Sequence, residues 1–133
     1  MRPLPLNRLL MLQMGYAYVG IMYNVGSLFA QRGGQAPWAS TDAVLGVAAM
    51  SLYGLFLSTG LMKNLKLYRL LMGISVLLFG YSGVMTHLLN LGNQELYNSF
   101  WTWMAAPAIN GFGLALNLAG ACGCFKHKVR ASI

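Results

Sequence analysis

Residues 101–125 read WTWMAAPAINGFGLALNLAGACGCF, an unbroken run without a single Asp, Glu, Lys or Arg. A helix needs about 20 mostly apolar residues to cross the hydrocarbon core of a bilayer. Because lipid offers no hydrogen-bonding partners, the backbone of such a run must satisfy itself, as it does in a helix. The stretch therefore predicts a membrane-spanning helix.

Three further apolar runs of similar length lie at 9–30, 43–62 and 70–91. Only 8% of the 133 residues are charged and 57% are apolar, whereas soluble domains carry roughly 25% charged residues. So few charges cannot cover a water-exposed surface. The sequence therefore predicts an all-α membrane protein, a single membrane domain over 1–133 that forms a bundle of four transmembrane helices.

Basic residues are distributed unevenly between the predicted loops. All nine Lys and Arg except Arg32 fall in the N-terminal tail, the connection between the second and third runs, or the C-terminal tail. Four spans place these three regions on one side, and Asp42 and Glu95, the only acids, on the other. Because cytoplasmic loops are enriched in Lys and Arg, both termini are expected on the cytoplasmic or matrix-like side of a bacterial or organellar inner membrane. The expected inner basic residues include Lys63, Lys66, Arg69, Lys126 and Lys128.

Small and polar side chains recur at spacings of three or four in the predicted helices. Helices in lipid associate through close packing and hydrogen bonds, and an unpartnered amide in hydrocarbon costs roughly 2–7 kcal/mol. We therefore expect these side chains to face the inside of the bundle. The predicted stripe comprises Gln13, Tyr16, Gly20, Asn24, Gly54, Ser58, Gly73, Gly80, His87, Asn110, Gly113, Asn117 and Gly120.

A short sequence similarity suggests an internal duplication. Residues 8–11 and 69–72 both read RLLM, and 53–56 (YGLF) resembles 112–115 (FGLA). A tandem repeat would relate two helical hairpins by a pseudo-twofold axis along the membrane normal. Chance similarity between apolar segments is the alternative.

Aromatic residues gather at the predicted outer side, where phenol and indole rings favour the headgroup boundary. They are expected to anchor the protein or to form a surface for lipid or a partner: Trp38, Tyr97, Phe100, Trp101 and Trp103. Among Asp, Glu, Lys, Arg and His, only His87 lies within a predicted span, which makes it a functional candidate. A structural hydrogen bond, proton handling, haem ligation and contact with a quinone are the alternatives for this side chain.

Residues for familiar chemistry are sparse. The predicted spans contain no Asp or Glu, although ion-coupled carriers commonly use one, and no nucleophile site can be assembled from Ser, His and acidic residues. Cys122 and Cys124 are expected to be small structural residues. We therefore expect no enzyme activity, no catalytic or metal-binding residue, and no cofactor beyond structural lipids. The net charge of +7 is explained by topology, so nucleic acid is not an expected partner.

The favoured hypothesis is a non-catalytic integral membrane subunit that packs against and stabilises a larger membrane protein complex, or associates with itself. One alternative is a small channel or transporter with a pore lined by Gln13, Asn24, Asn110 and Asn117. A second alternative is a lipid- or quinone-binding membrane protein that uses the outer aromatic belt and His87.

Overall fold

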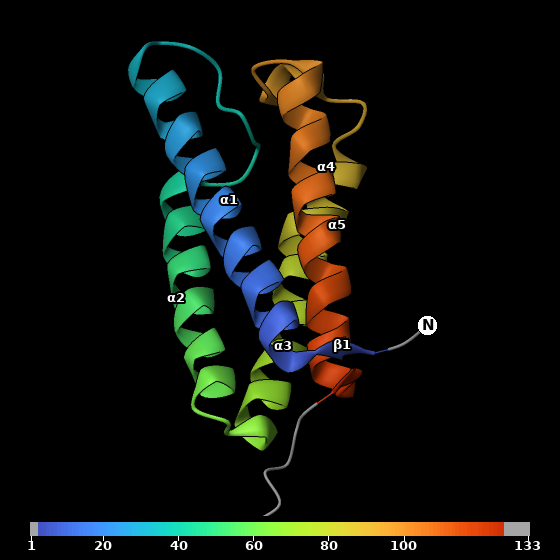
Figure 1. Ribbon diagram of the computed structural model, residues 1–133. Helices are drawn as coiled ribbons and strands as arrows, with labels where there is room; N and C mark the ends of the chain where they lie inside the picture. Colours follow the sequence, from blue (N-terminus) through green and yellow to red (C-terminus); the bar gives the residue numbers. More distant parts are fainter. Residues whose placement is uncertain (1–2, 127–133) are drawn as a thin grey trace, which may run out of the picture.

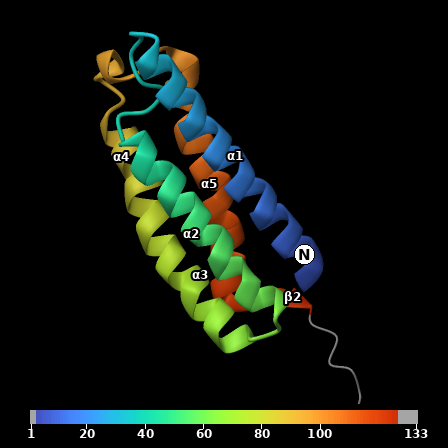
Figure 2. The same ribbon diagram turned by 90° about the vertical axis from the view of Figure 1, so that its left-hand side faces the viewer.

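The computed structural model describes residues 3–126, and this part of the chain is mostly helical. The helices and strands, in chain order, are β1 (Leu4–Pro5), α1 (Leu6–Arg32), α2 (Ala43–Leu61), α3 (Leu65–Phe79), the π-helical turn η1 (Gly80–Met85), α4 (Thr86–Leu89), the 3-10 turn η2 (Gln94–Leu96), α5 (Phe100–Cys122) and β2 (Phe125–Lys126). Segments α3, η1 and α4 form one continuous helical segment. Figures 1 and 2 show this segment lying beside α2 and α5.

Three helices are long and apolar enough to cross a membrane: α2, the continuous segment Leu65–Leu89, and α5. This confirms the prediction of a helical protein with membrane-spanning segments. Helix α1 is the longest but is less apolar, because it carries Gln13 and Asn24. The third helix begins at Leu65 rather than at residue 70, since Asn64 accepts a hydrogen bond from the Leu67 amide at its start. Lys66 therefore lies inside the helix and not in a loop.

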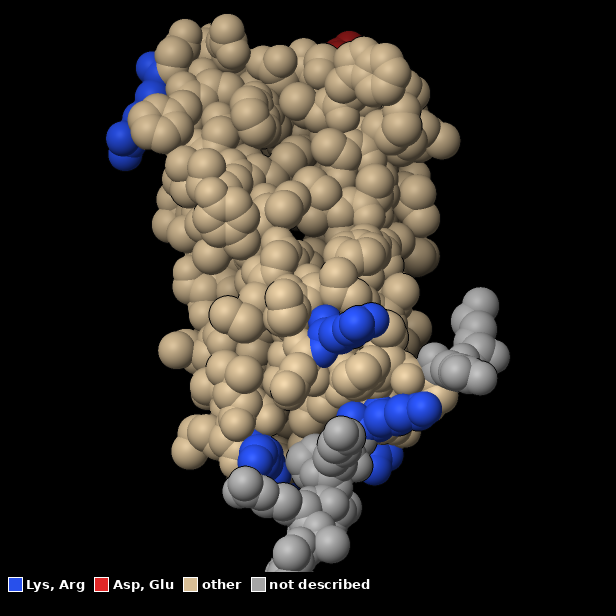
Figure 3. All heavy atoms as spheres, in the orientation of Figure 1, with Lys and Arg blue, Asp and Glu red and all other residues tan. Residues whose placement is uncertain are grey.

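The two ends of the molecule differ in charge. We call the end that carries the short parallel pairing of β1 with β2 and the turn at 62–64 the basic end. We call the opposite end, formed by segments 33–42 and 90–99, the loop end. Figure 3 shows Lys and Arg gathered mainly towards the basic end. There Arg69 donates from Nε to the Ala121 carbonyl (3.0 Å), where a cation is favoured at a helix C-terminus.

The helices pack in two hairpins. Helix α1 packs along α2, and α3 packs along α5, while α1 also contacts α5. Helix α2 packs against α3, where Gly60 lies beside Tyr68 near the basic end and Tyr53 meets Phe79 further along. Towards the loop end a cavity lies between α2 and η1. The two hairpins therefore pack together near the basic end, whereas a cavity separates α2 from η1 towards the loop end.

An aromatic cluster fills the middle of the protein. Tyr16 of α1, Tyr53 of α2 and Phe79 of α3 meet edge to face, with ring centroids 5.4–6.1 Å apart. All three side chains are buried. Such edge-to-face pairs contribute about 0.5–1.5 kcal/mol each beyond the area they bury, so the cluster fixes how α1, α2 and α3 meet.

The residues that the suggested repeat would align lie in different environments. Leu9 is fully buried but Leu70 is 62% exposed, and Tyr53 is 1% exposed while Phe112 is 51% exposed. The similar stretches therefore do not occupy equivalent faces of their helices. The two hairpins do lie side by side, but the residue correspondence read from the sequence is not reproduced in their packing.

The predicted inward stripe is wrong on α2. Gly54 and Ser58 are exposed, and the face that packs inward carries Met50, Tyr53 and Leu57 instead. The reason is that Tyr53 bonds and packs in the core, which turns the small residues one position later towards the outside. On α3, Gly73 is half-buried but has no neighbour that a Cβ would meet.

Glycines on α5 provide a direct test of close packing. A Cβ at Gly113 would overlap the ring of Tyr16, whereas one at Gly111 would meet nothing within 4 Å. We expect Gly113→Ala to destabilise the protein by about 1–3 kcal/mol through overpacking. Gly111→Ala should be neutral or stabilising, by up to about 1 kcal/mol. Thermal unfolding in detergent measures both, and equal midpoints for the two variants would contradict the packing described.

Candidate functional site

A buried polar cluster lies between the aromatic core and the basic end. The Tyr68 hydroxyl donates to Gln13 Oε1 (2.7 Å), and the Tyr53 hydroxyl donates to Asn117 Oδ1 (2.6 Å). Gln13 Nε2 joins the two pairs by donating to Asn117 Oδ1 (3.3 Å). It also lies 3.1 Å from Met72 Sδ. One network therefore connects α1, α2, α3 and α5.

The members of this cluster are shielded from the surface of the protein. Gln13, Tyr68 and Asn117 are fully buried. Within the described residues, Asn117 Nδ2 is a buried side-chain nitrogen without a hydrogen-bond partner. An unsatisfied buried group costs about 1–3 kcal/mol, so the network includes an unfavourable member. Its evident role is to set which faces of the four helical segments meet.

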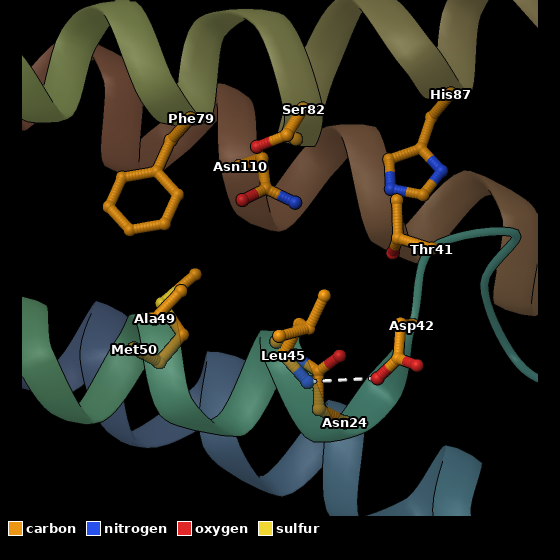
Figure 4. Close-up of a pocket in the computed structure, with 12 residues that line it drawn as sticks. Asn24, Thr41, Asp42, Leu45, Ala49, Met50, Phe79, Ser82, His87 and Asn110 are labelled. Carbon is orange, nitrogen blue, oxygen red and sulfur yellow. Dashed lines mark hydrogen bonds between the residues drawn. The ribbon is translucent and has the colours of Figure 1, made fainter.

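A cavity of about 340 Å³ lies on the other side of the aromatic core, between α2 and η1. We call it the lateral cleft, because Leu45 and Ala49 on its α2 wall are exposed on the side of the protein. Figure 4 shows the two walls facing each other across the space. The lining residues are Asn24, Thr41, Asp42, Leu45, Gly46, Ala49, Met50, Phe79, Ser82, Gly83, His87 and Asn110.

The lateral cleft changes in polarity along its length. Phe79, Ala49 and Met50 lie at the end nearest the aromatic core, while His87, Thr41 and Asp42 lie towards the loop end (Figure 4). Within the described residues, no Lys or Arg lines it. The cleft is therefore apolar at its inner end and polar, without a cation, at its loop end.

Two asparagines reach the cleft from the helices behind its walls. Asn24 of α1 lies against Gly46 of α2, and Asn110 of α5 lies against Gly83 of η1, so that a Cβ on either glycine would overlap the amide. Asn24 Nδ2 donates to the Gly20 carbonyl (2.8 Å). Asn110 Oδ1 accepts from the hydroxyl of Tyr16 (3.0 Å). Because Gly46 and Gly83 have no side chain, the two asparagine amides can reach the cleft.

The π-helical turn determines which side chain caps the cleft. Up to Phe79 the buried positions of α3 follow the regular helical period, but Gly83 and His87 follow at intervals of four, wider than 3.6 residues per turn. The extra residue belongs to η1, where the Thr86 hydroxyl donates five residues back to the Tyr81 carbonyl (3.1 Å). Without this insertion Thr86, rather than His87, would point inward.

His87 is 2% exposed and is held in place by hydrogen bonds with Tyr97 and Trp103. Its Nδ1 lies 2.8 Å from the Tyr97 hydroxyl, which lies 3.0 Å from Ser40 Oγ. Trp103 Nε1 donates to the His87 carbonyl (2.9 Å). The other edge of the imidazole faces the cleft in Figure 4. The ring therefore connects the cleft to a chain of hydroxyl groups that runs to the loop end.

The predicted aromatic belt does not form one surface. Tyr97 and Trp103 are buried against His87, because their polar atoms bond to it. Trp38 is half-buried and packs against Tyr23. Of the predicted set, Phe100 and Trp101 are exposed, at 45% and 74%. Sequence reasoning missed Ser40, Gly46 and Ser82, whose roles depend on contacts across the fold.

The predicted inner basic residues Lys63, Lys66, Arg69 and Lys126 are exposed at the basic end, and Lys128 lies outside the described residues. Cys122 and Cys124 are free thiols at the same end. Across residues 3–126, no three His, Cys, Asp or Glu side chains lie together as a metal site would need.

The remaining stripe residues divide between these regions. Gly20 lies beneath Met50, Gly120 lies beneath Tyr68 and Met72, and Gly80 is in ordinary contact with Leu114. Comparisons with protein-family models, with curated proteins and with solved structures find no match for this chain. We therefore infer a function from the geometry of the polar cluster and the lateral cleft.

Replacing one phenol of the polar cluster tests its contribution. Tyr68→Phe removes the hydrogen bond to Gln13 Oε1 and leaves that oxygen buried. We expect a loss of about 1 kcal/mol in unfolding free energy. Tyr81→Phe is the matched control, because Tyr81 is 73% exposed on the same helical segment. Unfolding in mixed detergent micelles measures both; a stability of Tyr68→Phe equal to that of the control would exclude a structural role for the bond.

Proposed function

We propose that this protein is an integral membrane protein with four spanning helices that binds an amphipathic molecule of the bilayer in the lateral cleft. The observation that carries the proposal is the polarity gradient of the cleft, from Phe79 and Met50 to His87 and Thr41. A ligand site is typically a mostly apolar pocket with a few convergent polar groups. An opening on the side of a membrane helix is accessible to molecules dissolved in lipid.

The fourth span of the proposal is α1. Its 27 residues make a helix of about 40 Å, enough to cross the hydrocarbon core. The polar side chains that lower its apolar character, Gln13 and Asn24, are buried against neighbouring helices. Its lipid-facing surface is therefore more apolar than its composition, which supports a membrane-spanning α1 packed beside the other three.

The basic end is assigned to the cytoplasmic or matrix-like side by the bias of Lys and Arg. The loop end then lies at the outer surface, and His87 lies near the outer headgroup boundary. In that orientation the polar end of the cleft lies towards the headgroups of the outer leaflet, and its apolar end lies towards the lipid tails. An amphiphile would place its polar group beside His87 and its tail towards Phe79.

Packing against a larger membrane complex is the second candidate function. The exposed pair Phe100 and Trp101, with ring centroids 5.8 Å apart, favours it, because aromatic residues are enriched at protein interfaces. A pore is less well supported. Its proposed lining is divided, since Gln13 and Asn117 lie in the polar cluster while Asn24 and Asn110 reach the cleft.

Filling the cleft tests the proposed binding function. Ala49→Phe places an aromatic ring on the cleft wall, whereas Ala48→Phe adds the same ring to the neighbouring exposed position outside the lining. We expect Ala49→Phe to reduce crosslinking of a photoreactive lipid to the α2 and η1 peptides roughly tenfold, equivalent to about 1.4 kcal/mol. Ala48→Phe should crosslink like the parent protein. Equal labelling of both variants would exclude the cleft as a binding site.

Cysteine labelling tests whether α1 crosses the membrane. In a background lacking Cys122 and Cys124, we expect Gln35→Cys to react with a membrane-impermeant maleimide applied to intact cells. Leu4→Cys should react only after permeabilisation, because a spanning α1 separates these exposed positions. Labelling of both from the same side would mean that α1 does not span.

A further inference from the structure

We propose that the occupant of the lateral cleft is a membrane quinone or its quinol, held through its ring oxygens by His87 at the outer end and by the amides of Asn24 and Asn110 deeper in. This identification depends on the binding function proposed above and adds the chemical class of the ligand. Four features of the cleft lead to it: its charge, the depth of its polar groups, the ability of His87 to donate or accept a hydrogen bond, and its size and opening.

The charge of the lining favours an uncharged polar group. Among residues 3–126, none of the twelve that line the cleft is Lys or Arg, and the one charged side chain there, Asp42, is acidic. Phosphate groups are normally held by Arg, Lys or free backbone amides. Here the Asp42 carboxylate already accepts from the amide of Leu45 at the start of α2 (2.9 Å). A phosphate headgroup would meet a carboxylate and no cation, whereas a quinone oxygen carries no charge to neutralise.

The polar groups lie at two depths. Asn110 lies against Gly83 and marks the inner depth. His87 follows Gly83 by one turn of the helical segment and marks the outer depth. One turn corresponds to roughly 5–6 Å along a helix, a span comparable to a six-membered ring with an oxygen at each end. Each asparagine amide uses one N–H within its own helix, so its second N–H is available to a ligand. A ligand with a single hydroxyl would use only one of these levels.

His87 can bond either oxidation state of the ligand. When the Tyr97 hydroxyl donates to Nδ1, the other ring nitrogen carries the proton and can donate to a quinone carbonyl. In the other tautomer Nδ1 donates to Tyr97, and the free nitrogen accepts from a quinol hydroxyl. The Tyr97 hydroxyl can take both roles because Ser40 Oγ, 3.0 Å away, is itself both donor and acceptor.

The size and opening of the cleft suit a ring with a long tail. Its volume of about 340 Å³ is at the small end of ligand pockets and accommodates a headgroup rather than a whole lipid. Leu45 and Ala49 are exposed beside it, so a tail can leave between α2 and η1 into the bilayer. Phe79 and Met50 supply an apolar floor for the ring.

The test uses the full chain in phosphatidylcholine nanodiscs and a photoreactive azidobenzoquinone with a short alkyl tail. We expect the probe to label peptides of α2 or the η1–α4 segment, and an unlabelled decylbenzoquinone to compete. Diacylglycerol and phosphatidylglycerol at the same mole fraction should not compete. His87→Leu should weaken competition roughly tenfold, and His87→Gln, which keeps a donor and an acceptor, should recover part of it.

Matched controls separate binding from folding. Leu88→Ala, next to His87 on the same segment, should compete like the parent, because Leu88 is exposed and does not line the cleft. Ala49→Phe should abolish labelling while leaving His87 intact, which keeps the test valid if His87→Leu does not fold. Labelling that is unaffected by His87→Leu and Ala49→Phe would overturn the proposal. Cleft labelling by a photoreactive lipid without competition by quinone would overturn the quinone identity alone, leaving the binding function in place.

Discussion

The hydrogen bonds among Gln13, Tyr68, Tyr53 and Asn117 are the constraint on which the rest of the structure depends. In lipid, burying apolar surface gives helices little reason to associate, so hydrogen bonds and close packing decide which faces meet. This network fixes one residue from each of α1, α2 and α3 around Asn117 of α5. Once those faces are set, Tyr16 and Phe79 must meet Tyr53, and the aromatic core follows.

The lateral cleft is a consequence of where that network lies. Because the polar cluster joins all four helical segments in the half nearer the basic end, nothing comparable draws α2 against η1 in the other half. At the loop end the connections are made instead between loops and helix ends, as when the Tyr23 hydroxyl lies 2.6 Å from the Trp38 carbonyl and 2.7 Å from that of Thr102. These contacts hold α1 and α5 while α2 and η1 stay apart, so a cleft opens between them.

The helices were predictable from the sequence because membrane-spanning segments are specified locally by length and apolar character. The amides Gln13 and Asn117 were likewise predictable as inward-facing, since hydrocarbon penalises an unpaired amide. The inward face of α2 was not, because small residues at Gly54 and Ser58 satisfy the same spacing rule as Met50 and Tyr53. His87 was among the side chains expected to face inward, and it is buried. The extra residue in the η1 turn was not predictable, because no charge or proline in the sequence marks it.

Part of the polar lining of the cleft is supplied by helices that do not form its walls. The side chains that α2 and η1 present to the cleft are mostly apolar. Each of these two elements has a glycine where an asparagine of a neighbouring helix lies against it: Gly46 of α2 beside Asn24, and Gly83 of η1 beside Asn110. A wall built of helices in lipid can carry few polar side chains of its own, because those near the rim would face hydrocarbon. Placing Asn24 on α1 and Asn110 on α5 solves this difficulty, since each amide stays bonded within its own helix. In the proposed binding site these glycines act by making room for the asparagine amides and contribute no side chain, so a search for chemically active residue types does not find them.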